Sequence, residues 1–251
     1  MNIITNSDIE KYHKEGYCIL KNAIPEKILA GLDQNCKICI DDIHQLMDES
    51  KTDTLGISHR NKRYFIANKY KKMNNNHSKN FLFSDEMATI TSKLLGKNVY
   101  LFHEQFVVKS AEQGMNFSWH QDSGYIGHPH TTYLTCWIPL VNVNEENGTV
   151  FVLPIPESGI REIVPHTQDA TTNDKVGYHG KKPGIPVIIN RGDLVCFSSI
   201  TFHRSSANRS SEMRPAYIAQ YSPEVIKKKD SNECWGLKDP FIIDGKRRAI
   251  I

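Results

Sequence analysis

Three side chains of this sequence have the types and the spacing of a metal site. His120 and Asp122 lie two residues apart in SWHQDSGY, and His203 follows roughly eighty residues later in SSITFHRSS. In an extended segment, residues i and i+2 point to the same side, so His120 and Asp122 can converge on one ion while Gln121 points away. Two imidazoles and one carboxylate on one face form the triad that holds non-haem Fe(II) and leaves positions open for a cosubstrate and dioxygen. The spacing therefore predicts the iron site of an oxygenase.

An arginine downstream of these residues indicates a second part of the site. Arg214 begins the strand-like stretch RPAYIAQY, and an arginine buried there needs an anionic partner because an unpaired buried charge is very costly. The fork of the guanidinium matches a carboxylate. The natural partner is the distal carboxylate of 2-oxoglutarate, which would chelate the iron at the open positions. Arg209 is the rival anchor, but its Ser- and Asn-rich turn favours a solvated side chain.

Five segments together resemble the phytanoyl-CoA dioxygenase family of Fe(II)/2-oxoglutarate-dependent oxygenases, in a match that runs from about Asp8 to Tyr221. These segments are WHQDSGY at 119–125, TCWIPL at 135–140, ENG at 146–148 with VLP at 152–154, RGD at 191–193, and the stretch 203–214. The resemblance implies that His120, Asp122 and His203 are the iron ligands. It also implies that most of the chain is one oxygenase domain.

The resemblance assigns further residues to the cosubstrate. Arg214 is implied as the 2-oxoglutarate anchor, Ser205 as its hydroxyl helper, and Trp137 as a wall of the cosubstrate pocket, with Thr135 on the same face of its strand. The implied reaction uses O2 and oxidises a small molecule, most simply by hydroxylation, while 2-oxoglutarate is decarboxylated to succinate and CO2. A carboxylate at position 122, where related halogenases carry Gly or Ala, favours hydroxylation or another oxidative outcome such as desaturation or ring formation.

The substrate is not identified by the resemblance, because members of the family accept acyl-CoA thioesters, amino acids, phosphonates and natural-product intermediates. Gln105 and Lys109 share one face of the strand before the iron motif and are candidates for contact with the cosubstrate or a polar substrate. Further candidates for the substrate pocket are Tyr125, His128 and Arg63, with His103 and His130. The His128-Pro-His130 spacing also raises a second metal, but its turn context favours surface histidines.

The N-terminal third of the chain has helical patterning. Ser7 or Asn6 is expected to cap a short helix that ends at Gly16, before a strand at 17–20. Pro25 opens a longer helix, in which apolar residues recur at spacings of three and four as far as Met47. A third helix is expected at 85–95, ending at Gly96. The polar stretch 50–80 is expected to be a loop that covers the mouth of the active site.

The remaining chain has the pattern of strands and turns. Short runs typical of strands lie at 99–109, 131–141, 149–153, 186–190, 194–198 and 214–221. About eight such strands form two facing sheets. We therefore expect a mainly β protein with flanking helices, a double-stranded β-helix (jelly roll, cupin-like) braced by N-terminal helices. Residues 1–251 would form a single oxygenase domain with a helical part at about 1–98, a jelly-roll core at about 99–222 and a C-terminal tail at 223–251.

Composition agrees with this class of protein. A net charge of +3 is too small to indicate nucleic acid as a partner, and no apolar run approaches the length of a membrane span. The N-terminus lacks the pattern of a signal peptide, which predicts a cytoplasmic protein, a monomer or small homo-oligomer. The six cysteines, including the Cys36-x-x-Cys39 pair, show no disulfide framework and are expected to be buried thiols.

Two other classes of function use the same fold. A metal-dependent hydrolase or isomerase would bind zinc or manganese at the triad and would have no use for Arg214. A non-catalytic binding protein would have no reason to retain the ligands together with Arg214, Ser205 and Trp137. The joint presence of these residues favours the oxygenase.

Overall fold

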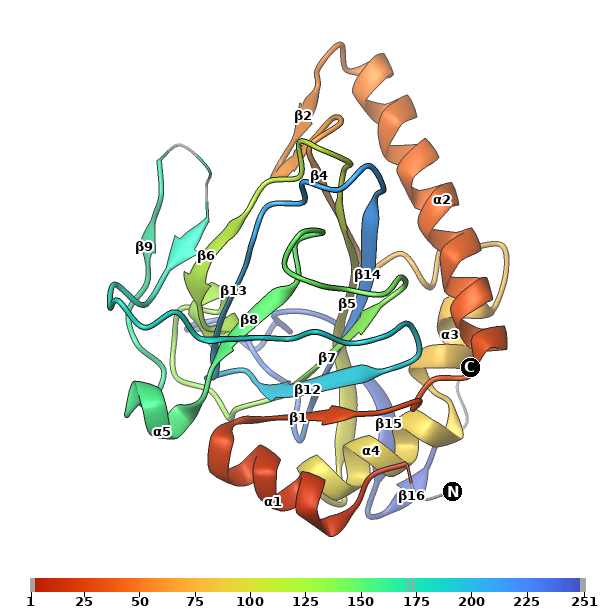
Figure 1. Ribbon diagram of the computed structural model, residues 1–251. Helices are drawn as coiled ribbons and strands as arrows, with labels where there is room; N and C mark the ends of the chain where they lie inside the picture. Colours follow the sequence, from red (N-terminus) through yellow and green to blue (C-terminus); the bar gives the residue numbers. More distant parts are fainter. Residues whose placement is uncertain (1–2, 171, 173, 249–251) are drawn as a thin grey trace.

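The computed structural model describes residues 3–170, 172 and 174–248, and two facing antiparallel sheets form its centre (Figure 1). The larger sheet has ten strands, in the order β1 (Tyr17–Leu20), β12 (Leu194–Ser198), β7 (Leu134–Pro139), β14 (Arg214–Ser222), β5 (Val99–Lys109), β4 (Arg63–Ala67), β3 (Ser58–His59) and β2 (Thr54–Leu55), with β15 (Asp239–Ile243) paired to β5 and β16 (Lys246–Arg247) paired to β15. The smaller sheet has the order β11 (Ile185–Pro186), β8 (Val150–Leu153), β13 (Phe202–Ser205) and β6 (Phe117–His120). This arrangement is the predicted double-stranded β-helix.

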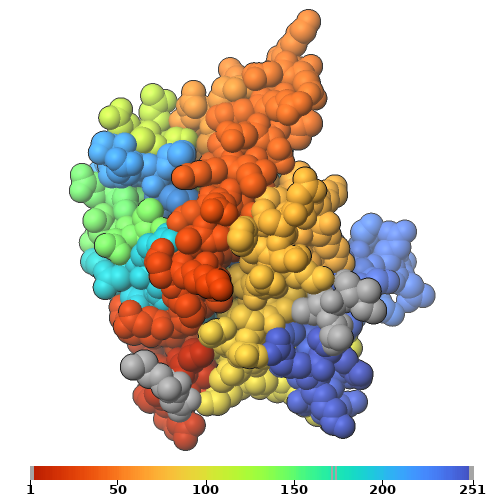
Figure 2. Space-filling view, turned by 90° about the vertical axis from the view of Figure 1, so that its right-hand side faces the viewer, coloured from red at the N-terminus to blue at the C-terminus, as the bar shows by residue number. Residues whose placement is uncertain are grey.

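The helices cover the outer side of the larger sheet. They are α1 (Asn6–Glu15), α2 (Glu26–Glu49), α3 (His77–Leu82) and α4 (Asp85–Leu95), while the short α5 (Ile155–Ser158) and the 3₁₀ helix η1 (Asp122–Tyr125) lie elsewhere. Figure 2 shows the face on which α2 lies beside the α3 and α4 region. No helix in the described part of the chain is long and apolar enough to cross a membrane.

Alternation along the strands separates the main core from the cavity between the sheets. On β5, Phe106 and Val108 belong to the cluster of buried residues that includes the helices, whereas His103, Gln105 and Val107 line the cavity. Successive residues of a strand point to opposite faces, so one strand serves both layers. The larger sheet is therefore buried on its helical side and holds the site on the other.

The predicted helices are present, with one correction at an N-cap. Neither Ser7 nor Asn6 caps α1; Thr5 does, in a capping box in which Thr5 and Asp8 bond each other's backbone N–H. Gly16 ends the helix with φ 84°, in the left-handed region that favours glycine. In α2 most of the apolar stripe is buried, but Ile28 is half-buried and Leu46 is 46% exposed.

The polar stretch 50–80 is the main departure from the predicted elements. It is not one loop, because β4 pairs along β5 and extends the larger sheet, and α3 follows. The stretch 186–190 was also predicted wrongly, since its strand is the two-residue β11. Past residue 222, β15 joins β5 and continues the larger sheet. The six cysteines are free thiols, and all but Cys234 are buried, as predicted.

Candidate metal centre

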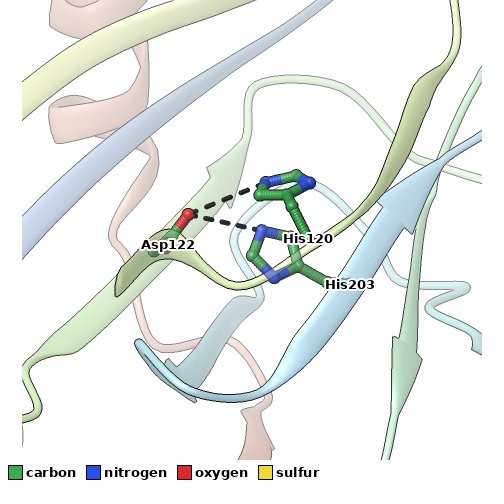
Figure 3. Close-up of side chains that lie close together, drawn as sticks. All are labelled: His120, Asp122 and His203. Atoms are coloured by element: carbon green, nitrogen blue, oxygen red, sulfur yellow. Dashed lines mark ion pairs between the residues drawn. The ribbon is translucent and has the colours of Figure 1, made fainter. Parts of the chain in front are cut away.

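His120, Asp122 and His203 converge on one point between the two sheets (Figure 3). His120 ends β6 and His203 lies opposite it on β13, with the two imidazole centroids 4.2 Å apart. The Oδ1 atom of Asp122 lies 3.8 Å from Nε2 of His120 and 3.5 Å from Nε2 of His203. Asp122 begins η1, so it reaches the histidines from a turn and not from a continuous strand. Among the residues that the structure describes, this is the one group of three or more such side chains close enough to hold a metal ion.

Hydrogen bonds leave one ligand atom of each histidine directed at this point. Nδ1 of His120 donates to the Ser118 carbonyl at 2.8 Å, and Nδ1 of His203 donates to the Thr201 carbonyl at 3.0 Å. Burial, with His203 close by, lowers the pKa of His120, which favours the neutral imidazole that metals bind. The two Nε2 atoms therefore have the tautomer and the orientation of metal ligands.

The carboxylate is held in the same way. Oδ2 of Asp122 accepts hydrogen bonds from Oγ1 of Thr135 at 2.5 Å and from Nε2 of Gln220 at 3.0 Å. Gln220 also donates to Thr135, so the three side chains form one network. With Oδ2 engaged, Oδ1 is directed at the histidines as a single ligand atom, and the donor set fits a divalent iron ion.

A cavity of about 260 Å³ adjoins the three ligands. The larger sheet contributes residues of β5, β7 and β14 to its wall, and the smaller sheet contributes residues of β6, β8 and β13. Its described lining residues are Ile57, Phe65, His103, Gln105, Val107, Phe117, His120, Asp122, Tyr125, Tyr133, Trp137, Val150, Phe197, His203, Arg204, Ser205, Arg214, Ile218, Gln220 and Trp235.

Arg214 places an unpaired positive charge on the wall of this cavity. Its side chain is 1% exposed, and its Nε atom is buried without a hydrogen-bond partner among the described residues. Within the described residues, the side chain of Arg214 donates one hydrogen bond, from Nη1 to the Val107 carbonyl at 3.4 Å. Burial lowers the pKa of Arg214 to about 9, so the guanidinium is still charged at neutral pH. Such a charge fits a carboxylate bound in the cavity.

Several residues that the sequence singled out meet in this cavity. Ser205, Trp137, Gln105 and Tyr125 line it together with Arg214. Thr135 does not line it but bonds the metal ligand Asp122.

Other candidates do not line the cavity. Lys109 is buried and donates to the Ser206 carbonyl, and Arg63 forms a buried ion pair with Asp174 at 2.9 Å. Nδ1 of His128 bonds the neighbouring Pro129 carbonyl, and Nε2 of His130 bonds Ser123 at 3.0 Å. Arg209 is exposed. Alternation along β5 puts Lys109 on the same face as the cavity-lining residues, but the last residue of β5 that lines the cavity is Val107.

The sequence did not point to several residues of the site. Tyr133, Gln220 and Trp235 belong to it, as do Ile57 and Phe65 from the stretch predicted to be a loop. His166 accepts a hydrogen bond from the backbone of Gln121, between two of the metal ligands. The alternation of β14 could have indicated Gln220, which is six residues after Arg214 and on the same face, whereas no spacing pointed to His166 or Trp235.

A double-stranded β-helix that carries two histidines and one aspartate at a common point, with a buried arginine on the same cavity, defines a class of protein: the non-haem iron oxygenases that use 2-oxoglutarate. The model of the phytanoyl-CoA dioxygenase (PhyH) family matches residues 12–216, and this chain belongs to that family. Iron is thus the metal of the triad, and 2-oxoglutarate is the cosubstrate.

Distant relatives agree with this assignment. The chain is 24% identical to phytanoyl-CoA dioxygenase domain-containing protein 1 of Danio rerio, over 86% of this chain and 89% of that protein. It is 30% identical to a 2-aminoethylphosphonate dioxygenase of an uncultured bacterium, over 57% of this chain and 53% of that protein.

Solved structures share the fold. EctD from S. alaskensis, solved with 2-oxoglutarate and 5-hydroxyectoine, has a TM-score of 0.70 at 17% identity and covers 98% of this chain and 88% of its own. The carbocyclase SnoK of nogalamycin biosynthesis has a TM-score of 0.68 at 18% identity and covers 91% of this chain and 88% of its own.

Proposed function

We propose that this protein hydroxylates a small molecule and couples that oxidation to the decarboxylation of 2-oxoglutarate to succinate and CO2. The observation that carries the proposal is the pairing of an intact triad with the unpaired charge of Arg214 in one cavity. Bound iron and 2-oxoglutarate together supply the oxidising chemistry. The side chains of this chain bind, orient and shield these groups.

Arg214 is the proposed anchor of the distal carboxylate of 2-oxoglutarate. A guanidinium can donate two parallel hydrogen bonds to a carboxylate, and its Nε atom has no partner among the described residues. Ser205 lies two residues after His203 on β13, so both side chains point into the cavity, and its hydroxyl is available to the same carboxylate. Trp137 and Gln105 are proposed to flank the chain of the cosubstrate, and Arg214 lies 5.7 Å from the Trp137 ring.

The state of Asp122 favours hydroxylation, or another oxidative outcome such as desaturation or ring formation, over halogenation. Thr135 and Gln220 hold its carboxylate beside both histidines, so the place that a halide would need is taken by a protein ligand. Tyr125 lines the cavity and is 39% exposed, which makes it a candidate for substrate contact. Lys109, Arg63 and His128, which do not line the cavity, are left out of the proposed substrate site. The cytoplasmic location and the monomer or small homo-oligomer stay predictions from the sequence.

Anaerobic titration of the apo protein with Fe(II) and 2-oxoglutarate tests the proposal without a known substrate. We expect a visible charge-transfer band that needs both components. Arg214→Ala should weaken 2-oxoglutarate binding at least about thirtyfold, because it removes one partner of a buried charge pair. Arg209→Ala, which removes an exposed arginine of the same region, is the matched control and should bind normally.

Two results would contradict this assignment. Tight zinc binding without the band would favour a hydrolase or a binding protein. Equal 2-oxoglutarate affinity in the Arg214 and Arg209 variants would remove Arg214 from its role. Hydroxylation itself is checked with ¹⁸O2 and any compound that stimulates succinate release, because a hydroxylated product gains one labelled oxygen atom and a cyclised or desaturated product gains none.

A further inference from the structure

Apart from the residues assigned to the cosubstrate, most of the cavity wall consists of apolar side chains. They include Ile57, Phe65, Phe117, Tyr125, Tyr133 and Trp235. These six come from four separate parts of the chain, which are the β2–β4 segment, β6 with η1, the segment before β7, and the segment before β15. The rings of Phe65 and Phe117 meet edge to face, with centroids 5.0 Å apart. This wall suits a flat or compact apolar body.

The described part of the wall offers no free carboxylate, and the carboxylate of Asp174 behind it is paired with Arg63. Among the described lining residues, Asp122 has the one carboxylate, and the metal uses it. The Arg63 guanidinium lies 4.9 Å from the ring centroid of Phe117, and Nζ of Lys109 lies 5.2 Å from the same centroid. Arg63 and Lys109 are paired in register on β4 and β5, and both are buried. The Arg63 guanidinium therefore already engages the Phe117 ring, whereas burial lowers the pKa of Lys109 well below its usual value and disfavours its charge.

A cation also lies at the rim of the wall. Nζ of Lys175 lies 5.8 Å from the ring centroid of Tyr125 and donates to the Gly124 carbonyl at 3.1 Å. An aromatic cage can bind a cation only where its ring faces are open to that cation. Here Arg63 and Lys175 already occupy a face of Phe117 and of Tyr125, and the described lining residues offer a second cation no carboxylate besides Asp122.

The polar groups in this part of the wall are uncharged at neutral pH. Burial lowers the pKa of His103, which keeps its imidazole neutral, and burial raises the pKa of Tyr133 well above its usual value. Both groups can form hydrogen bonds to a hydroxyl or carbonyl without selecting for charge.

We propose that the substrate presents an uncharged, ring-sized apolar body to this wall, and that the site rejects compounds that carry an ammonium group there. This inference rests on the proposed function, because it takes Arg214, Ser205, Gln105 and Trp137 as the cosubstrate site. The cavity of about 260 Å³ is slightly smaller than typical ligand sites of roughly 300–1,000 Å³, so the part of the substrate beside the metal is compact.

A pair of probes matched in shape tests the charge selection. 2-Phenylethanol and 2-phenylethylammonium are each titrated with the protein loaded with Fe(II) and 2-oxoglutarate under anaerobic conditions. Broadening of the ring-proton NMR lines by the paramagnetic iron reports binding beside the metal, and zinc-loaded protein supplies the background. We expect the alcohol to bind at least about tenfold more tightly than the ammonium, because the ammonium must be desolvated without an anionic partner. Equal binding of the two, or no iron-dependent broadening by the alcohol, would overturn the proposal.

A variant locates the binding site on the aromatic wall. Trp235→Ala should weaken binding of the alcohol about fivefold through the loss of one aromatic contact, while the charge-transfer band of iron with 2-oxoglutarate is unchanged. Ile188→Ala, at an exposed apolar side chain outside the cavity, is the control. Unchanged affinity in the Trp235 variant would contradict the assignment of the wall. If wild-type protein shows no charge-transfer band, the proposed function itself is contradicted. Failure of the substrate inference can therefore be distinguished from failure of the proposed function.

Discussion

The backbone N–H of Gln121, the residue between two metal ligands, donates a hydrogen bond to Nε2 of His166 at 2.9 Å. Nδ1 of His166 in turn donates to the Val164 carbonyl at 2.8 Å, so the imidazole has a defined tautomer. The ring also fills the space that a Cβ on Gly124 or Gly177 would need. His166 therefore supports the turn between His120 and Asp122 from outside the two sheets.

The side chain of Gln121 connects the same turn to the strand of the third ligand. Its Nε2 donates to the Glu162 carbonyl at 2.9 Å and to the Ile200 carbonyl at 2.8 Å, and its Oε1 accepts from the Val164 N–H at 3.0 Å. Ile200 lies just ahead of β13, which carries His203. Gln121 points away from the metal, as the spacing predicted, and it is fully buried.

The first prediction concerns His166 as a positioning residue. His166→Ala removes the acceptor of the Gln121 N–H, and we expect Fe(II) affinity to fall by about 10- to 100-fold, as for other residues that orient metal ligands. Competition with a chromophoric chelator measures the affinity. His166→Gln, which offers another acceptor, should recover part of the loss, and the exposed His179→Ala is the control. Wild-type affinity in His166→Ala would show that the turn holds its shape without this bond.

The second prediction concerns Thr135, which donates to Oδ2 of Asp122 at 2.5 Å. Thr135→Val keeps the shape of the side chain and removes the hydroxyl, so the carboxylate keeps only the Gln220 bond. We expect Fe(II) affinity to fall about tenfold with little change in the unfolding midpoint. A variant with lowered stability and normal iron affinity would assign Thr135 to packing of the sheet instead.

The fold and the triad were predictable because their signals are local. Strands such as 194–198 are short apolar runs between turn residues, and two ligands lie two residues apart in one motif. The strand β4 was missed because its first residue, Arg63, is charged and its neighbours in sequence are polar. Arg63 is nevertheless fully buried, since Asp174, more than a hundred residues away, supplies the partner. No pattern within 50–80 contains that information.

The cavity wall was less predictable than the metal ligands for the same reason. Trp235 reaches the cavity from the C-terminal segment, where it packs against Phe102 of β5 with ring centroids 5.5 Å apart. A lone tryptophan in a polar segment has no periodicity that assigns it to a face. Lys109, by contrast, was placed on the correct face by alternation, but alternation does not say where along a strand a cavity ends.

The third prediction concerns the buried pair of Arg63 and Asp174, which joins β4 to the residue that precedes β10 (Lys175–Val176). Arg63→Met leaves the Asp174 carboxylate buried without its partner, and we expect the free energy of unfolding to fall by about 3–5 kcal/mol. Arg63→Met combined with Asp174→Leu should be more stable than Arg63→Met alone. Urea unfolding of the four proteins in the cycle measures both effects.

An exposed pair supplies the comparison for this cycle. Lys228 and Glu233 lie 2.7 Å apart with both side chains largely exposed, and removal of Lys228 should leave the free energy of unfolding nearly unchanged because solvent screens the pair. A similar cost at both pairs would mean that water reaches Asp174 when Arg63 is absent.

The fourth prediction concerns Glu104, which faces the helical side of β5 and is 1% exposed. Burial raises the pKa of its carboxyl above the usual value, although Tyr217 Oη donates to it at 2.7 Å and the Tyr70 N–H at 3.0 Å. An acid whose folded pKa is raised contributes stability that is present below its unfolded pKa and is lost as the pH rises through the folded pKa. Glu104→Gln should therefore gain stability relative to the wild type between about pH 4.5 and pH 7.5. Urea unfolding at both pH values measures the free energy of unfolding, and the exposed Glu10→Gln is the control. If the difference in this free energy between Glu104→Gln and the wild type is the same at both pH values, Glu104 has the same pKa in the folded and the unfolded chain.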